Sequence, residues 1–232
     1  MFPDKNHAAL PPPLTVVGTI HSTAGLRQAL KLKPEALDLL EIRVDAFAEA
    51  TDQLLGSVTK LTIPLILTIR HPLEGAIHPM ATARRRELFH QFLPLAAFID
   101  VELRSVKTLT PIIEEARSRG IGVILSHHDF KRTPAQQRLQ ELAEDAHHLR
   151  ADLFKLATTT TTPSDLVTLL AFLAHEKRIP LSVMGMGRFG KISRLLLAQS
   201  GSRLNYGFLD KAQVPGQWSA SLLKARLSEL TC

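Results

Sequence analysis

The chain has 232 residues, of which 45% are hydrophobic and 22% are charged, a composition typical of a globular protein with one or two domains. The formal net charge is +6, but the basic residues are scattered and only 5% of residues are aromatic, so we expect no nucleic-acid partner and favour anionic small molecules. No apolar run is long enough to span a membrane, so we expect no membrane association.

Both ends of the chain bear on where the protein works. Residues 1–13 lack the apolar stretch of a secretory signal, and we expect them to form a flexible N-terminal segment. The single cysteine, Cys232, cannot form an intrachain disulfide, which fits a reducing compartment. We therefore expect a cytoplasmic protein.

Short runs rich in Val, Ile and Leu alternate with longer segments of helical periodicity along the whole chain. The predicted strands are Thr15–Ile20, Leu39–Val44, Pro64–Ile69, Phe98–Leu103, Gly122–Leu125, Leu153–Ala157, Pro180–Met184 and Arg203–Tyr206. Predicted helices between them include Ala81–Ala96, Val106–Gly120, Pro134–Arg150 and Pro163–Lys177. The repeated strand–helix order predicts an α/β fold, a (β/α)8 TIM barrel with a single domain over residues 1–232. A doubly wound open sheet is the alternative.

Polar residues interrupt the predicted strands with a period of two. A barrel strand is covered on both faces and should be almost entirely apolar. The exceptions lie towards the C-terminal ends of the strands, where barrel active sites form; they are Glu41, Arg43, Asp45, Thr68, Arg70, Asp100, Glu102 and Lys155. Unpaired buried charges cost several kcal/mol each, so we interpret the set as an active site. The alternative is a group of solvated strand ends with internal salt bridges.

Two adjacent histidines, His127 and His128, lie in the stretch "GVILSHHDFKRTP" at the fifth strand. Neighbouring residues on a strand point to opposite faces, so at most one of them can face the barrel interior. Ser126 and His128 share a face, which favours His128 as the functional residue, and we expect His127 to be exposed or a supporting residue. His147 and His148 lie on a polar helical stretch and are expected to be solvated.

The combination of lysine, histidine and arginine points to Schiff-base chemistry. A buried amine among other cations loses its proton more readily, and the neutral amine can attack a ketone or an aldehyde. The resulting iminium acidifies the adjacent carbon, a histidine can remove that proton, and arginines suit a substrate carboxylate or hydroxyls. Aldol cleavage, proton transfer and dehydration all follow this scheme, so the residue types leave the reaction open.

A metal site has weaker support. Ligands on one strand should stand at i and i+2, whereas His127, His128 and Asp129 are consecutive, and no second His-x-His occurs on another strand. We expect no metal.

Six motifs in this order and spacing resemble the type I 3-dehydroquinate dehydratase family, from about Thr15 to Gln217: "EIRVD", "TIRHPLEGA", "SHHDFKRTP", "FKLAT", "MGMGRFGKISR" and "PGQ". The resemblance implies a (β/α)8 barrel, no metal or organic cofactor, and a homodimer. It also implies that 3-dehydroquinate, a small-molecule substrate, is converted to 3-dehydroshikimate and water in the shikimate pathway.

The resemblance assigns a role to individual residues. Lys155 matches the Schiff-base lysine, His128 the general acid and base, Glu74 the carboxylate that orients the histidine, and Arg194 the arginine that holds the substrate carboxylate. The other implied substrate-binding residues are polar groups around the ring, apolar and aromatic walls, and two glutamines of a lid loop: Glu41, Arg43, Arg70, Met184, Met186, Phe130, Tyr206, Gln213 and Gln217.

The chain departs from the family pattern in the lid loop and after Glu74. Gln213 replaces the usual serine, a change that bears on loop closure and affinity. We expect the Leu209–Ser219 loop to close over the bound substrate, with Trp218 as its reporter. Ala76 replaces a frequent glycine, which would cost energy if the position needs a positive φ. Tyr206 replaces the commoner phenylalanine. A class I aldolase on the same barrel and an inactive barrel with a binding or regulatory role are the alternative functions.

Overall fold

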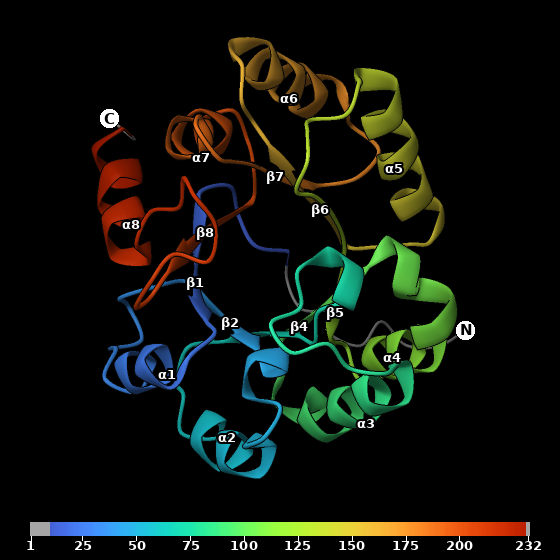
Figure 1. Cartoon of the computed structure of the whole chain (residues 1–232), viewed down its shortest axis with the longest axis vertical. Helices are drawn as coiled ribbons and strands as arrows, with labels where there is room; N and C mark the ends of the chain where they lie inside the picture. The colour runs from blue at the N-terminus through green and yellow to red at the C-terminus, as the bar shows by residue number, and fades with distance from the viewer. Residues whose placement is uncertain (1–9, 231–232) are drawn as a thin grey trace.

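The computed structural model describes residues 10–230, and these form a barrel of eight parallel strands inside a ring of eight helices (Figure 1). The strands are β1 (Thr15–Ile20), β2 (Leu39–Arg43), β3 (Leu65–Thr68), β4 (Phe98–Glu102), β5 (Gly122–Asp129), β6 (Leu153–Thr159), β7 (Leu181–Met186) and β8 (Leu204–Phe208). The helices are α1 (Thr23–Ala29), α2 (Thr51–Val58), α3 (Thr82–Phe92), α4 (Val106–Ser118), α5 (Gln136–His148), α6 (Pro163–His175), α7 (Gly190–Gln199) and α8 (Ala220–Glu229). The predicted TIM barrel is confirmed.

The sheet runs in the order β7-β6-β5-β4-β3-β2-β1-β8, so β7 and β8 are its two ends. Two hydrogen bonds join these end strands: the Arg203 amide donates to the Leu181 carbonyl at 2.9 Å, and Ser182 Oγ donates to the Leu204 carbonyl at 2.6 Å. These contacts nearly close the barrel and leave a seam along one side.

The barrel interior has an apolar layer and a polar layer. The apolar layer contains Val17, Leu39, Ile66, Phe98, Ile124 and Leu153, one from each of six strands. Because side chains on a strand repeat every two residues, the next inward positions are two residues further along: Thr19, Glu41, Thr68, Asp100, Ser126 and Lys155. All six are buried. The polar layer is therefore the floor of a site at the C-terminal ends of the strands.

Several predicted boundaries shift by a few residues. The predicted helix Ala81–Ala96 ends at Phe92, and Pro94 lies in a short 3-10 turn that follows it, because proline cannot continue the α-helical hydrogen bonds. Strand β5 continues to Asp129 and β7 to Met186 because both remain paired with β6. These extensions carry the side chains of His128 and Met186 on strands rather than on loops.

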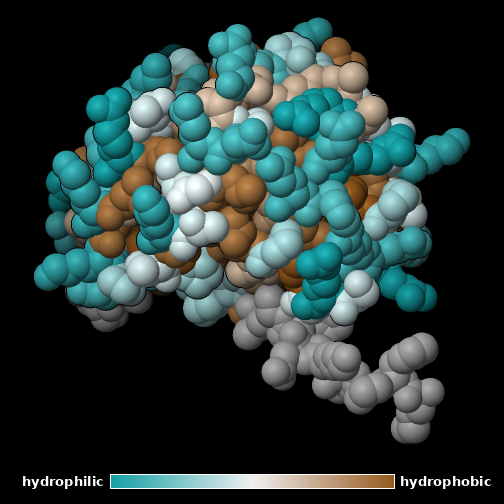
Figure 2. All heavy atoms as spheres, turned by 90° about the horizontal axis from the view of Figure 1, so that it is seen from below, coloured by the Kyte–Doolittle hydropathy of each residue, from teal (hydrophilic) through white to brown (hydrophobic). Residues whose placement is uncertain are grey.

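The N-terminal part of the described chain lies against the barrel. The Pro11 carbonyl accepts from Arg203 Nη1 at 3.1 Å, and Leu10 packs against the apolar layer. Most of the predicted flexible segment, residues 1–9, and Cys232 lie outside the described residues. Among the described residues, no helix is long and apolar enough to cross a membrane. Hydrophilic side chains cover much of the side shown in Figure 2, with apolar groups between them.

A fully buried arginine fixes α3 to the sheet. Arg85 donates from Nε to the Ile69 carbonyl at 2.9 Å, from Nη1 to Ser105 Oγ at 3.0 Å and from Nη2 to Glu102 Oε2 at 2.7 Å. The guanidinium thus joins α3, the end of β3 and the end of β4.

Replacing this arginine should destabilise the whole fold. Arg85→Met leaves Glu102 with one cationic partner fewer, so we expect the free energy of unfolding in urea to fall by about 3 kcal/mol. Arg86→Met is the matched control, because Arg86 is exposed on the same helix; its effect should stay below about 0.5 kcal/mol. Equal losses from the two variants would contradict the role assigned to Arg85.

Candidate active site

A cavity of about 250 Å³ opens at the C-terminal ends of the strands. Every residue proposed from the sequence for the site lines it: Glu41, Arg43, Arg70, Glu74, His128, Phe130, Lys155, Met184, Met186, Arg194, Tyr206, Gln213 and Gln217. Thr19, Gly75, Ile77, Ala157 and Val214 also line it. Residues spread over most of the chain therefore converge on one small space, of a size suited to a small metabolite.

Lys155 lies on β6 with its ammonium buried in the cavity floor. Its Nζ donates to Asp100 Oδ2 at 2.8 Å and to Glu41 Oε1 at 3.2 Å, and it lies 3.9 Å from the centre of the Tyr206 ring. The sequence had suggested cationic neighbours for this amine, but the structure places two carboxylates in contact with it. Arg70, the cation expected beside Lys155, instead donates to the same Asp100 carboxylate, at 2.9 and 3.0 Å.

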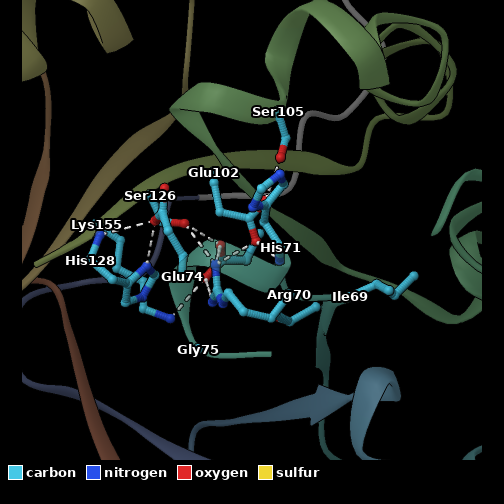
Figure 3. A network of polar contacts seen from close by, with 12 residues as sticks. Ile69, Arg70, His71, Glu74, Gly75, Glu102, Ser105, Ser126, His128 and Lys155 are labelled. Atoms are coloured by element: carbon cyan, nitrogen blue, oxygen red, sulfur yellow. Dashed lines mark hydrogen bonds and ion pairs between the residues drawn. The ribbon is translucent and has the colours of Figure 1, made fainter. Parts of the chain in front are cut away.

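Arg70 connects the carboxylates of the floor (Figure 3). Its guanidinium donates to both oxygens of Asp100, at 2.9 and 3.0 Å, to Glu102 Oε1 at 3.1 Å and to Ser126 Oγ at 2.9 Å. Burial opposes the ionisation of Asp100, but the charges of Arg70 and Lys155 outweigh it and hold the pKa of Asp100 well below its ordinary value. Asp100 therefore stays ionised between two cations.

His128 and Glu74 form a pair at the side of the cavity. Glu74 Oε2 lies 3.0 Å from His128 Nδ1 and accepts from the His128 backbone amide at 3.0 Å. When Glu74 is ionised, its carboxylate can only accept hydrogen bonds, so the ring proton then lies on Nδ1 and Nε2 is free to take a proton. The Phe130 ring stacks against the imidazole with centroids 6.2 Å apart.

Burial sets the protonation of this pair. It lowers the pKa of His128 well below its ordinary value, and the nearby positive charges of Arg70 and Lys155 act in the same direction. Burial also raises the pKa of Glu74 to about 7, with the negative charge of Glu102 adding to the effect. The imidazole is therefore neutral near pH 7, and the carboxylate beside it loses its proton in that range.

Glu74 reaches the cavity from a short 3-10 helix, η2 (Pro72–Glu74), which ends at Gly75 with a φ of 87°. The positive φ favours glycine, and a Cβ at this position would lie 2.7 Å from Cζ of Phe130, so that ring would have to shift. Ala76 carries no such strain, because the non-glycine residues with positive φ in the described chain are Leu14 and Arg150.

Arg194 has a different environment from the other cations of the cavity. It is buried on α7, its Nη1 donates to the Tyr206 carbonyl at 2.9 Å, and its Nε has no partner. Within residues 10–230 no carboxylate pairs with it. Burial lowers its pKa to about 10, so the group remains positively charged at neutral pH. A buried cation without an acidic partner is suited to a carboxylate on a bound ligand.

The loop after β8 covers the cavity edge and rests on the turn between β7 and α7. Gly187 donates its amide to the Pro215 carbonyl at 2.9 Å, and Trp218 Nε1 donates to the Lys191 carbonyl at 3.0 Å. Gln217 Oε1 accepts from the Gln213 amide at 2.7 Å. Gln217 thus orders its own loop, and its amide nitrogen remains for other contacts.

Several residues that contribute to the site had no role predicted from the sequence. Asp100 and Glu102 were recognised as buried polar residues but received no role, although Asp100 lies in the same layer as Glu41 and Lys155. Arg85 and Arg104 approach from segments outside the barrel strands, and their spacing in the sequence gave no signal. His147 and His148 are exposed as predicted, whereas His127 is partly buried, and burial lowers its pKa.

In the described part of the chain, no group of three or more His, Cys, Asp or Glu side chains could hold a metal ion.

Comparison with known proteins identifies the family of the chain. Residues 15–231 match the family described as type I 3-dehydroquinase. The chain belongs to the type I 3-dehydroquinase family. A 3-dehydroquinate dehydratase of Thermococcus gammatolerans is 32% identical over 213 residues, which cover 91% of this chain and 97% of that protein. That of Latilactobacillus sakei is 35% identical over 210 residues, covering 84% and 85%.

Solved structures of type I 3-dehydroquinases have the same barrel. The enzyme of Clostridium difficile, crystallised with covalently modified comenic acid, matches with a TM-score of 0.85 at 26% identity and covers 95% of this chain and 93% of its own. A putative aldolase domain from Bacteroides vulgatus matches with a TM-score of 0.64 at 12% identity, covering 94% of this chain and 80% of that one. The second likeness shows the fold alone.

The environment of the His128–Glu74 pair predicts the charge of the His128 ring. Because the pKa of His128 is lowered, its imidazole should remain neutral as the pH falls through 6.5, the ordinary value. Nitrogen-15 chemical shifts of the histidine rings, with His128→Asn to assign the signal, would measure this directly. A His128 ring that titrates at or above pH 6.5 would contradict the environment described here.

Proposed function

We propose that this chain dehydrates 3-dehydroquinate to 3-dehydroshikimate, with Lys155 as the covalent catalyst and His128 as the general acid and base. Membership of the family and the activity named for its relatives support the reaction. The observation that carries the residue assignments is the sharing of one cavity by a buried lysine, a histidine–glutamate pair and an arginine without an acidic partner.

The first step joins the substrate to Lys155. The ketone oxygen takes up the protons that the ammonium gives up as the C–N bond forms, and it later leaves as water. Asp100 Oδ2 and Glu41 Oε1, which contact Nζ at 2.8 and 3.2 Å and have lowered pKa values, stay ionised and hold the nitrogen in place. The neutral amine attacks the C3 ketone, and loss of water gives a protonated imine. The two carboxylates also stabilise the positive charge that stays on this nitrogen.

The second step removes a proton from C2. The neutral His128 ring presents an unprotonated Nε2 because Nδ1 is bound to Glu74. Nε2 takes the C2 proton, and the electrons of that bond move into the imine to give an enamine. Glu74 holds the ring and stabilises the imidazolium that forms.

The third step expels the C1 hydroxyl. The enamine electrons return, the C1–O bond breaks, and the imidazolium of His128 gives its proton to the departing hydroxyl, which leaves as water. A second water hydrolyses the conjugated imine, which frees 3-dehydroshikimate and restores Lys155. The net change is the loss of one water, and proton transfer of this kind contributes roughly 10² to 10⁴ of the rate.

The remaining cavity residues orient the ring. Arg194, a buried cation that lines the cavity, is suited to bind the substrate carboxylate. Arg43, fixed to Asp45 by two hydrogen bonds of 2.8 and 2.9 Å, presents a cation beside the cavity, and Glu41 offers an acceptor to ring hydroxyls. Gln213 and Gln217 approach from the loop after β8, and Met184, Met186, Phe130 and Tyr206 form the walls.

The proposal includes features that rest on the family resemblance: a place in the shikimate pathway, a homodimer, a cytoplasmic location and no cofactor. Light scattering would measure the oligomeric state. A class I aldolase or an inactive barrel are the alternatives, and an assay with 3-dehydroquinate that follows the ultraviolet absorbance of the conjugated product separates them from a dehydratase.

Covalent capture should identify the reacting lysine. After incubation with 3-dehydroshikimate, borohydride should reduce the imine and leave a ligand-sized mass on Lys155, located by peptide mapping. Lys155→Met should show no adduct and no turnover. An adduct on another lysine, or none in the wild-type chain, would contradict the assignment.

The two adjacent histidines should separate on mutation. His128→Ala should lower kcat by about two to four orders of magnitude, because the proton transfer loses its catalyst. His127→Ala should change kcat by less than about tenfold, since its side chain faces away from the cavity on the strand. Steady-state kinetics on both variants measure the difference, and a larger loss at His127 would show that the wrong histidine is assigned.

A further inference from the structure

We propose that Arg104 is a positioning residue for the dehydration: it holds the Glu74 carboxylate in the orientation in which that carboxylate holds the His128 ring. This inference rests on the proposed function, in which His128 moves the protons. It adds to the reaction a residue that does not line the cavity and that the family motifs above do not include.

The two oxygens of Glu74 have separate partners. Oε2 accepts from the His128 backbone amide at 3.0 Å and contacts His128 Nδ1 at 3.0 Å. Oε1 forms an ion pair with Arg104 Nε at 3.0 Å. Because each oxygen of the carboxylate has its own partner, rotation of the carboxylate is restricted and Oε2 stays at the imidazole (Glu74 and His128 in Figure 3).

The backbone that carries Arg104 is itself held in place. Arg104 lies in the 3-10 helix η4 (Leu103–Ser105), directly after Glu102 at the end of β4. Ser105 Oγ donates to Glu102 Oε2 at 2.7 Å and accepts from Arg85 Nη1 at 3.0 Å. The buried network below the cavity therefore fixes the turn from which Arg104 reaches Glu74.

The charges around Glu74 leave a specific task for this arginine. Burial and the charge of Glu102, at the end of β4, favour the protonated carboxyl, whereas Arg70, after β3, and Arg104 favour the ionised one. The guanidinium of Arg70 is already bound to Asp100, Glu102 and Ser126. Arg104 is the cation that contacts Glu74 directly, and an ionised Glu74 is the form that accepts from Nδ1 of His128.

The exposed fractions of the two side chains indicate that Arg104 matters for positioning Glu74 more than for the stability of the fold. The Glu74 side chain is 3% exposed, whereas that of Arg104 is 42% exposed. Loss of a half-exposed arginine removes little packing, and Glu74, with a pKa of about 7, can take up a proton instead of remaining as an unpaired buried charge. Removal of Arg104 should therefore change catalysis while the fold remains.

The test compares Arg104→Gln, Arg104→Lys and the control Arg132→Gln by steady-state kinetics from acidic to alkaline pH. Arg132 is an exposed arginine in the loop after β5, so its replacement changes the net charge equally. In the wild type, kcat should rise with pH as Glu74 ionises near 7. Arg104→Gln should lower kcat roughly three- to tenfold, change KM less than about twofold, and move the acidic limb up by about half a unit to one unit.

Relative to Arg104→Gln, Arg104→Lys should restore part of kcat and should move the acidic limb of the kcat profile part of the way back to its wild-type pH. Arg132→Gln should match the wild type.

A double mutant shows whether Arg104 acts through Glu74. In a Glu74→Gln background, which has no carboxyl to titrate, adding Arg104→Gln should cause almost no further loss of kcat. An unshifted limb in Arg104→Gln, or an equal loss in both backgrounds, would overturn the inference while wild-type activity and the Lys155 adduct still support the proposed function. Absence of both in the wild type would overturn the proposed function and, with it, this inference.

Discussion

The interior of the barrel depends on the pairing of the buried Lys155 ammonium with Asp100. Four hydrogen-bonded ion pairs of alternating charge continue from this contact: Lys155 with Asp100, Asp100 with Arg70, Arg70 with Glu102, and Glu102 with Arg85. Their donor–acceptor distances are 2.7 to 3.1 Å. Charges removed from water are tolerated only when such partners surround them, so each member requires the next. The alternation crosses β6, β4, the end of β3 and α3, and it fixes their C-terminal ends relative to one another. The same interactions that make the buried charges tolerable therefore set the geometry of the reacting groups.

This arrangement divides the cavity into two electrostatic halves. On one side the cations are matched by carboxylates, so that side has little attraction for an additional anion. On the other side Arg194 has a neutral carbonyl and the Met184 sulfur as its partners. In the mechanism proposed above, this distribution attracts the carboxylate of the substrate to Arg194 and leaves the carbonyl carbon for the amine of Lys155. The orientation proposed for the substrate thus follows from the uneven distribution of carboxylates around the cationic side chains of the cavity.

Most of the fold and much of the site follow from the sequence because both depend on periodicity. A two-residue repeat identifies Glu41, Asp100 and Lys155 as inward-facing, and parity alone selects His128 over His127. Glu74 has no such signal, since it lies on a 3-10 turn whose direction depends on Gly75 and the Phe130 ring. Its role was predicted from the family resemblance alone.

The partners of these residues were harder to predict. Lys155 was expected among cations, because a sequence shows which residues face inward but not which neighbour each one binds. Arg85 and Arg104 enter from segments whose approach to the cavity is set by tertiary packing. The predicted strands ended too early at β5 and β7, because pairing with β6 extends both of them. This extension depends on the neighbouring strand and not on the local sequence preference.

Arg194 also has a structural role at the seam between β7 and β8. These two end strands of the described sheet share no ladder, and the guanidinium of Arg194 contacts the Met184 sulfur on β7 and the Tyr206 carbonyl on β8 from a helix that connects them. The side chain that we propose to bind the substrate carboxylate therefore also connects β7 and β8 where no ladder joins them. In that proposal, substrate binding and closure of the barrel involve the same guanidinium.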